Sequence, residues 1–304
     1  MRRPLAFVLS GGGARGALQV GALRALLEAG FRPDLLVGTS IGAANAAFLA
    51  VNGVSLQTVD ALSQTWRDAA VADLMPANYL WLTLRVLFNR TGWRPYHRMR
   101  EFFIAHGLSP DLRFSDIRGV RLMLVAADLN SGRPVVFGAN PEDSVLEGLL
   151  ASTALPPWVR PMEKEDMLLM DGGVVSNLPV EPALAQGARA VIALDLADPR
   201  CIPIGDERFG PFLAKLMRTV EQRQTDLEMA LAAERGVEVW HISLMGPEPV
   251  QGWDFSHTEA LMARGYAIAR EELARRTAAR RPWWRRWLGA LRPSAESWRG
   301  HPSE

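Results

Sequence analysis

The stretch Leu35-Leu36-Val37-Gly38-Thr39-Ser40-Ile41-Gly42 decides the fold of this chain. Its first three residues predict a short apolar strand, and the Ala-rich run at 43–50, which contains no proline, predicts a closely packed helix. Gly38, Ser40 and Gly42 have the spacing G-x-S-x-G. A strand that turns so sharply into a helix holds the serine with its Oγ exposed, which predicts a nucleophile elbow. The alternative is a Gly/Ser turn that only joins the two elements.

A glycine-rich loop precedes this elbow by one strand and one helix. Phe7-Val8-Leu9 predicts a buried strand, the loop Ser10-Gly11-Gly12-Gly13-Ala14-Arg15-Gly16 follows it, and a helix is expected over 17–29. Backbone N–H groups between a strand and a helix are suited to bind a negatively charged oxygen. The loop is therefore a candidate anion site.

Two functions compete for this loop. It fits the dinucleotide fingerprint G-x-G-x-x-G at Gly11, Gly13 and Gly16. That fingerprint needs an acidic residue at the end of the second strand, about 20 residues on, whereas Asp34 precedes that strand. We therefore favour an oxyanion hole for Ser40, formed by the N–H groups of Gly11, Gly12 and Gly13. A tight turn alone would not require three consecutive glycines, which cost conformational entropy.

The glycine loop and the elbow together resemble the patatin-like phospholipase family, in particular its bacterial members related to neuropathy target esterase. That family places an aspartate in an Asp-Gly-Gly or Asp-Gly-Ala motif, and here Asp171-Gly172-Gly173 follows the apolar strand 167–170. Ala151-Ser152-Thr153-Ala154-Leu155-Pro156 and Asn177-Leu178-Pro179 also resemble family motifs. The resemblance covers about residues 5–200.

The resemblance implies an α/β fold of three layers, with a mostly parallel central sheet and helices on both faces. It implies a serine acyl hydrolase with a Ser40–Asp171 dyad, acting on lipid acyl esters such as phospholipids or lysophospholipids. It also suggests that Arg15 positions the loop or an anionic headgroup. The expected supporting residues are Arg15, Gly16, Gly38, Gly42, Gly172 and Gly173. Dyad hydrolysis needs no metal or cofactor, and the sequence shows no cluster of ligands with metal-site spacing.

In such a dyad Ser40 attacks the ester carbonyl and Asp171 accepts the serine proton. An exposed aspartate has a pKa of about 3.9 and is a weak base for a hydroxyl. Burial beside the apolar strand 167–170 would disfavour the charged form and raise that pKa. We therefore expect Asp171 to be buried.

Two alternatives remain open. A Ser-His-Asp triad of the α/β-hydrolase type could use Ser40 and Asp171 with His241 or His257, although neither histidine lies in a recognisable loop motif. A non-catalytic nucleotide-binding module could use the glycine loop, but it leaves the elbow and the Asp-Gly-Gly motif unexplained.

Three further polar residues lie at strand or helix ends. Asp128 is expected to cap a turn. Asp195 ends a predicted buried strand but lacks the flanking glycines of Asp171, so it is the weaker candidate base. Ser152 lacks an elbow and is expected to be structural.

The other predicted elements follow from apolar periodicity. Strands are expected at 120–127, 135–137, 190–195 and 237–242, the first two as a hairpin, and helices at 55–66, 94–107, 145–152, 181–187, 212–235 and 257–281, with a loop over 201–211. The apolar segment 74–93 is expected to be a buried helix or an acyl-binding, membrane-facing flap.

Composition limits the remaining functions. The 304 residues carry a net charge of +1, which gives no indication of nucleic-acid binding. The single cysteine, Cys201, excludes an internal disulfide and indicates a reducing compartment. The N-terminal apolar run is too short for a signal peptide, and no run approaches the roughly 18 apolar residues of a membrane span. We expect a cytoplasmic protein.

The C-terminal segment differs from the rest. We expect one domain over 1–281 and a tail over 282–304. Between Arg280 and Arg292 the sequence alternates arginine with tryptophan. These residue types settle at a lipid headgroup boundary, so the tail predicts peripheral contact with the inner face of a membrane.

Overall fold

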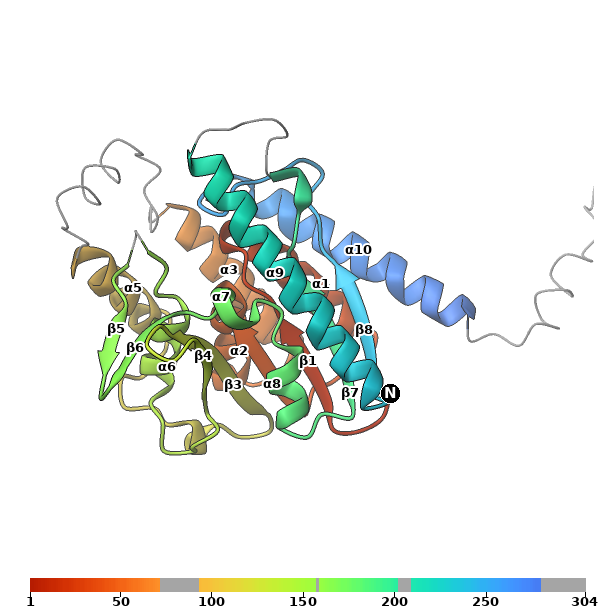
Figure 1. Ribbon diagram of the computed structural model, residues 1–304. Coiled ribbons are helices and arrows are strands. Elements are labelled where there is room, and N and C mark those ends of the chain that lie inside the picture. The colour runs from red at the N-terminus through yellow and green to blue at the C-terminus, as the bar shows by residue number, and fades with distance from the viewer. Residues whose placement is uncertain (72–92, 157–158, 202–208, 280–304) are drawn as a thin grey trace, which may run out of the picture.

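A single mixed sheet of eight strands organises the molecule (Figure 1). In this computed structural model, residues 1–71, 93–156, 159–201 and 209–279 are described. The strand order is β5-β6-β3-β2-β1-β7-β8, and β4 also pairs with β3. The strands are β1 (Leu5–Leu9), β2 (Leu35–Thr39), β3 (Arg121–Asp128), β4 (Arg133–Phe137), β5 (Met162–Lys164), β6 (Met167–Asp171), β7 (Ala190–Asp195) and β8 (Glu238–Ser243).

Most neighbouring strands are parallel. The pairs β3/β2, β2/β1, β1/β7 and β7/β8 are parallel, whereas β3/β4, β3/β6 and β5/β6 are antiparallel. This confirms the mostly parallel sheet and the β3–β4 hairpin. The sequence did not predict β5, nor that β6 runs against β3.

Both faces of the sheet are covered by helices, because β1 has apolar residues at every position. Phe7 and Leu9 contribute to one core, and Ala6 and Val8 contribute to the other, as the alternation of side chains along a strand requires. The first core includes residues of α1 (Ala17–Glu28), α2 (Ile41–Asn52), α3 (Leu56–Val71), α6 (Val145–Ser152) and α10 (Thr258–Ala279). The second includes residues of α8 (Val180–Ala185) and α9 (Phe209–Glu234). The three-layer prediction is confirmed (Figure 1).

Two helices and four 3-10 turns remain among the described residues. The remaining elements are α5 (Trp93–Ala105), α7 (Gly173–Ser176), and the 3-10 turns η1 (Gly13–Gly16), η2 (Phe114–Asp116), η3 (Pro199–Cys201) and η4 (Phe255–His257). The prediction of a loop as far as Pro211 was wrong, because α9 begins at Phe209. A proline is tolerated in the first turn of a helix, where its missing N–H would have no intrahelical acceptor.

Two predictions lie outside the described residues. They are the flap at 74–93, apart from Trp93, and the Arg/Trp tail at 280–304. Among the helices that are described, none has the length and apolar character needed to cross a bilayer.

Candidate active site

The turn between β2 and α2 holds Ser40 in a strained backbone conformation. Ser40 has φ 55° and ψ −125°, and only one other non-glycine residue among those described has a positive φ. The backbone packs so closely around this turn that a side chain would not fit at Gly38 or Gly42. A Cβ on Gly42 would lie 2.2 Å from the Leu9 carbonyl oxygen, and one on Gly38 would lie 2.4 Å from that of Gly42. The turn therefore has the geometry of a nucleophile elbow.

A second serine holds this turn in place. The buried Ser152 Oγ accepts a hydrogen bond from the Ser40 N–H at 3.0 Å and donates one to the Val125 carbonyl at 2.6 Å. Both ends of its hydroxyl are thus occupied by backbone. Ser152 has a structural role, which was expected, although its contact with Ser40 was not.

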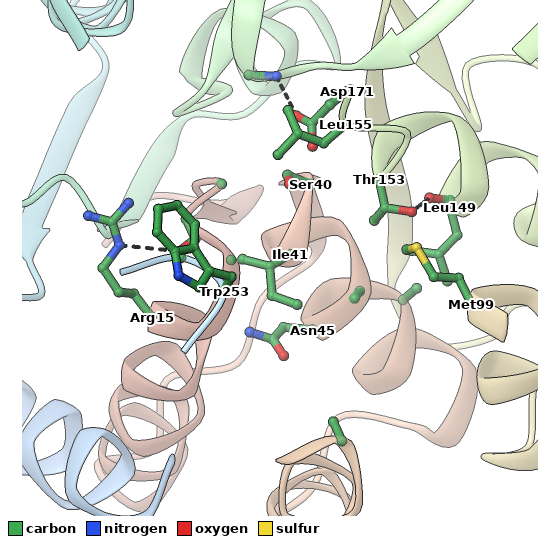
Figure 2. A pocket seen from close by; sticks show the side chains of 18 of the residues that line it. Arg15, Ser40, Ile41, Asn45, Met99, Leu149, Thr153, Leu155, Asp171 and Trp253 are labelled. Atoms are coloured by element: carbon green, nitrogen blue, oxygen red, sulfur yellow. Dashed lines mark hydrogen bonds between the residues drawn. The ribbon is translucent and has the colours of Figure 1, made fainter. Parts of the chain in front are cut away.

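The antiparallel direction of β6 brings Asp171 to the elbow. Thr39 at the end of β2 pairs with Val125, and Asp171 at the end of β6 pairs with the next residue, Ala126. Strand β4 pairs with β3 at both of these positions, so it occupies one edge of β3 there. Strands β2 and β6 must therefore both pair with the other edge of β3, where their C-terminal ends meet. Figure 2 shows the Asp171 carboxyl facing Ser40.

The Asp171 carboxyl is buried, with 3% of the residue exposed. Its Oδ1 accepts a hydrogen bond from the Gly173 N–H at 2.9 Å. Burial raises the pKa of Asp171 to about 6, and hydrogen bonding from the Ser40 side chain and the Gly173 N–H limits the rise. A carboxyl with this pKa is a stronger base than an exposed aspartate and is still ionised at neutral pH.

The glycine loop lies beside the elbow, and its N–H groups differ in whether they have a backbone acceptor. The Gly11 N–H donates to the Asn177 carbonyl at 3.1 Å, so it is already occupied. Among the hydrogen bonds of the described residues, none joins the N–H of Gly12 or Gly13 to a backbone oxygen. Of the three predicted donors, Gly11 therefore has a backbone acceptor within the described residues, and Gly12 and Gly13 have none there.

Arg15 braces this loop. Its Nε donates to the Gly12 carbonyl at 3.2 Å, the bond drawn in Figure 2, and its Nη1 donates to the Cys201 Sγ at 3.5 Å. Gly16 packs against Ile41 and Trp66. The arginine is thus fixed at the rim of the site.

The two glycines after Asp171 differ in their surroundings. A Cβ on Gly172 would lie 2.3 Å from the Val125 carbonyl oxygen, whereas one on Gly173 would have no neighbour closer than 3.2 Å. Gly172 is therefore required for the close packing of β6 on β3. Gly173 contributes its N–H to Asp171.

Ser40 and Asp171 open into a cavity of about 1200 Å³. In Figure 2 Arg15 and Trp253 lie on one side of Ser40, and Met99, Leu149 and Thr153 lie on the other. The cavity lining as a whole is largely apolar. Its apolar walls come from α2, α3, α5, α6 and the segment after α6, and they include Ile41, Phe48, Trp66, Phe102, Phe103, Leu149, Leu155 and Val159. Cys201, Glu221 and Gln251 also line the cavity, and burial raises the pKa of Glu221.

The histidines considered for a triad have other partners. His241 Nε2 lies 2.9 Å from Asp195 Oδ2, and His257 Nδ1 lies 3.2 Å from Asp254 Oδ2. Neither is among the residues that line the cavity. His106 does line it, and its ring nitrogens contact the Phe102 carbonyl and the Asp68 carboxyl.

A buried polar network that was not predicted from the sequence lies under the elbow. Asn45 on α2 donates to the Gly16 carbonyl at 3.1 Å and to Gln19 Oε1 at 3.0 Å, and it accepts from Trp66 Nε1 at 2.9 Å. The network ties the glycine loop to the helix that follows Ser40. Its only signal in the sequence is one asparagine within an Ala-rich helix.

No metal centre is evident in the parts of the chain that the structure describes, where no group of three or more His, Cys, Asp or Glu side chains could hold an ion.

The chain matches a known protein family over more than half of its length. The family model described as Patatin-like phospholipase matches residues 7–184. Mouse "Patatin-like phospholipase domain-containing protein 7" is 31% identical over 194 residues, which are 63% of this chain and 13% of that protein. "Lysophospholipase nte1" of Aspergillus terreus is 30% identical over 196 residues, 64% of this chain and 12% of that protein.

The match covers a larger share of one bacterial relative. "Uncharacterized protein YqhO" of Bacillus subtilis is 30% identical over 208 residues, 62% of this chain and 70% of that protein. Among solved structures, VipD from Legionella pneumophila is similar with a TM-score of 0.47 and 13% identity, covering 90% of this chain and 67% of that one. The family model spans more than half of the sequence and includes the elbow, the glycine loop and Asp171. The chain therefore belongs to the patatin-like phospholipase family.

Proposed function

We propose that this protein is a serine hydrolase that cleaves lipid acyl esters, in the manner of a phospholipase A or a lysophospholipase, with a Ser40–Asp171 dyad. The proposal rests mainly on one observation. A buried carboxyl with a raised pKa faces a serine on a strained turn, at the floor of a largely apolar cavity.

In this mechanism Ser40 Oγ attacks the ester carbonyl and its proton passes to Asp171. The carbonyl oxygen becomes negatively charged and accepts hydrogen bonds from the N–H groups of Gly12 and Gly13. Losing one such donor typically costs about 100- to 1000-fold in rate. Protonated Asp171 then gives its proton to the leaving alcohol, and water repeats the sequence to release the fatty acid from Ser40.

The cavity supports a lipid substrate. Its lining offers Leu, Ile, Val and Phe side chains to an acyl chain, and burying each CH₂ group contributes roughly 0.8 kcal/mol. Arg15, on the other side of Ser40 in Figure 2, offers a cation to a polar headgroup. The lysophospholipase among the relatives agrees with this substrate class.

Two other parts of the proposal concern the extent of the domain and the C-terminal segment. We propose that residues 1–281 form the hydrolase domain and that the Arg/Trp segment of 280–292 rests on a lipid surface from the cytoplasmic side. Both can be tested by truncation after residue 279 and vesicle co-sedimentation.

Hydrolysis of a p-nitrophenyl acyl ester series and of a lysophospholipid tests the proposed function. We expect the purified full chain to hydrolyse both and Ser40→Ala to fall to background. Ser109→Ala, which changes an exposed serine outside the cavity lining, should keep wild-type activity. Equal hydrolysis by wild type and Ser40→Ala would show that the elbow is not catalytic.

A further inference from the structure

A buried carboxyl that the mechanism does not use lies behind the active site. Glu228 on α9 is 9% exposed and is not among the residues that line the cavity. Its Oε1 accepts a hydrogen bond from Ser176 Oγ at 2.5 Å, and its Oε2 accepts one from the Glu181 N–H at 2.6 Å. One side chain of α9 thus holds both α7 and the beginning of α8.

Ser176, the partner of Glu228, belongs to a short helical turn that follows Asp171 and is hydrogen-bonded next to Ser40 and to the glycine loop. This turn, α7, begins two residues after Asp171. The Ser176 carbonyl accepts a hydrogen bond from Thr39 Oγ1 at 2.8 Å, and Thr39 directly precedes Ser40. The next residue, Asn177, accepts the Gly11 N–H at 3.1 Å. A shift of this turn therefore moves the aspartate, the serine turn and the glycine loop relative to one another.

Helix α9 fixes the turn at a second point. Gln224, one helical turn before Glu228, donates from Nε2 to the Val174 carbonyl at 2.6 Å. Residues four apart lie on the same face of a helix, so Gln224 and Glu228 form a two-point brace between α9 and α7. Of the two, Glu228 alone carries an ionisable group.

We propose that Glu228 is a positioning residue of the active site, which acts through Ser176 to hold Asp171 and Ser40 in the geometry required for proton transfer. The inference rests on the proposed function, because it concerns the same reaction. Catalysis is sensitive to such placement, since a misplacement of about 1 Å can cost on the order of 100-fold in rate.

The brace depends on the charge of Glu228. Burial raises the pKa of Glu228 to about 7, and the nearby Glu181 carboxylate adds to the rise, while the bonds from Ser176 and the backbone N–H groups of Glu181 and Val180 oppose it. Both partners of the carboxylate are donors. Protonation turns these charge-assisted hydrogen bonds into weaker neutral ones and places a hydrogen on one of the two oxygens.

Other ionisable groups lie on the elements around Glu228, and α9 itself carries Glu221, whose pKa is also raised by burial. Glu181 is the one titratable residue of α7 and α8, the elements that its carboxyl contacts. Strand β8 also packs on α9 and carries Glu238 and His241, which pair with Arg276 and Asp195. A loss of the brace on acidification is assigned to Glu228 only where Glu228→Gln removes it.

The test measures kcat and KM for a p-nitrophenyl ester between pH 5 and 9, with full-length wild type, Glu228→Gln, Ser176→Ala and the double variant. We expect each single variant to lower kcat about tenfold with KM within about twofold, because the ester still binds while proton transfer is misaligned. The double variant should be no worse than Ser176→Ala, because both substitutions act on the same contact. Wild-type kcat should show an ionisation near pH 7 that Glu228→Gln lacks.

Controls separate this role from folding and from the proposed function. Asp226→Asn changes an exposed carboxylate on the same helix and should behave as wild type. If Glu228→Gln fails to fold by circular dichroism, Ser176→Ala still removes the contact and must show the fall in kcat. Folded variants with wild-type kcat and pH profile would overturn the proposal while leaving the hydrolase intact. Equal activity of wild type and Ser40→Ala would instead remove the proposed function, and the positioning role with it.

Discussion

Two aspartates at strand ends, Asp171 and Asp128, show how surroundings separate a base from a turn cap. Both residues are buried, with 3% and 6% exposed. Asp128 accepts four hydrogen bonds, from the N–H groups of Asn130, Ser131 and Leu168 and from the Ser131 hydroxyl. These bonds hold the pKa of Asp128 below its ordinary value, with the Ser131 hydroxyl the largest cause.

Asp171 has fewer donors. The Gly173 N–H and the Ser40 side chain oppose the effect of burial, and they do not cancel it, so its pKa is raised to about 6. Burial alone therefore does not identify a base. What distinguishes Asp171 is a carboxyl that is buried, incompletely hydrogen-bonded and aimed at a serine.

The largest expected effect is on activity. Asp171→Asn keeps the size of the side chain and removes the base, so hydrolysis should fall on the order of 1,000-fold or more, as when a member of a catalytic triad is removed. Asp128→Asn should stay within about threefold of wild type, because Asp128 does not line the cavity. Steady-state hydrolysis of a p-nitrophenyl ester measures both. Similar losses in the two variants would mean that the comparison misidentifies the base.

The same substitutions should change stability in opposite directions. Asp171 has a higher pKa in the folded protein, about 6, than its ordinary 3.8. Its folded form binds more protons in that interval, so wild-type stability falls as pH rises from about 4 to 6. At pH 8 Asp171→Asn should therefore be more stable by about 3 kcal/mol at most, and this gain should vanish below pH 4.

Asp128→Asn should lower the melting temperature instead. The pKa of Asp128 is lowered on folding, so its contribution is present at neutral pH and is lost as pH falls through the folded pKa. Thermal unfolding of the three proteins at pH 8 and pH 4 measures both effects. A destabilised Asp171→Asn at pH 8 would contradict the burial argument.

The pH dependence of catalysis gives a smaller effect. Since Asp171 must be ionised to accept a proton, kcat/KM should fall about tenfold per pH unit well below pH 6. An inflection near pH 4 would show instead that Asp171 is titrating as an exposed carboxyl. Rates from pH 4.5 to 8 with a substrate that does not ionise test this.

The smallest effect distinguishes the dyad from a triad. His241→Ala and His257→Ala should keep activity within about twofold, because surface or remote substitutions rarely change a site. His241 binds Asp195 and not Asp171. A loss of more than about 100-fold in either variant would favour a histidine base instead.

The sequence predicted those parts of the site that local motifs determine. The elbow around Ser40, the glycine loop and the strand before Asp171 each follow from a few consecutive residues, and the structure contains all three elements. The mostly parallel sheet was expected from the resemblance of these motifs to the patatin-like phospholipase family.

Contacts between distant segments could not be predicted. The direction of β6 depends on its pairing with β3, and that pairing is what brings Asp171 to Ser40. Ser152 holds the Ser40 N–H from another helix, and Glu228 holds Ser176 from α9. The use of the Gly11 N–H by Asn177 is of the same kind. A single sequence carries no signal for which buried polar groups become partners.

The central claim is that Asp171 activates Ser40, and covalent labelling tests it most directly. A fluorophosphonate reacts with an activated serine, and mass spectrometry locates the label. We predict labelling of Ser40 at a rate that rises with a midpoint near pH 6, that is unchanged in His106→Ala, His241→Ala and His257→Ala, and that is lost in Asp171→Asn. Labelling of Asp171→Asn at the wild-type rate, or of a serine other than Ser40, would contradict the account.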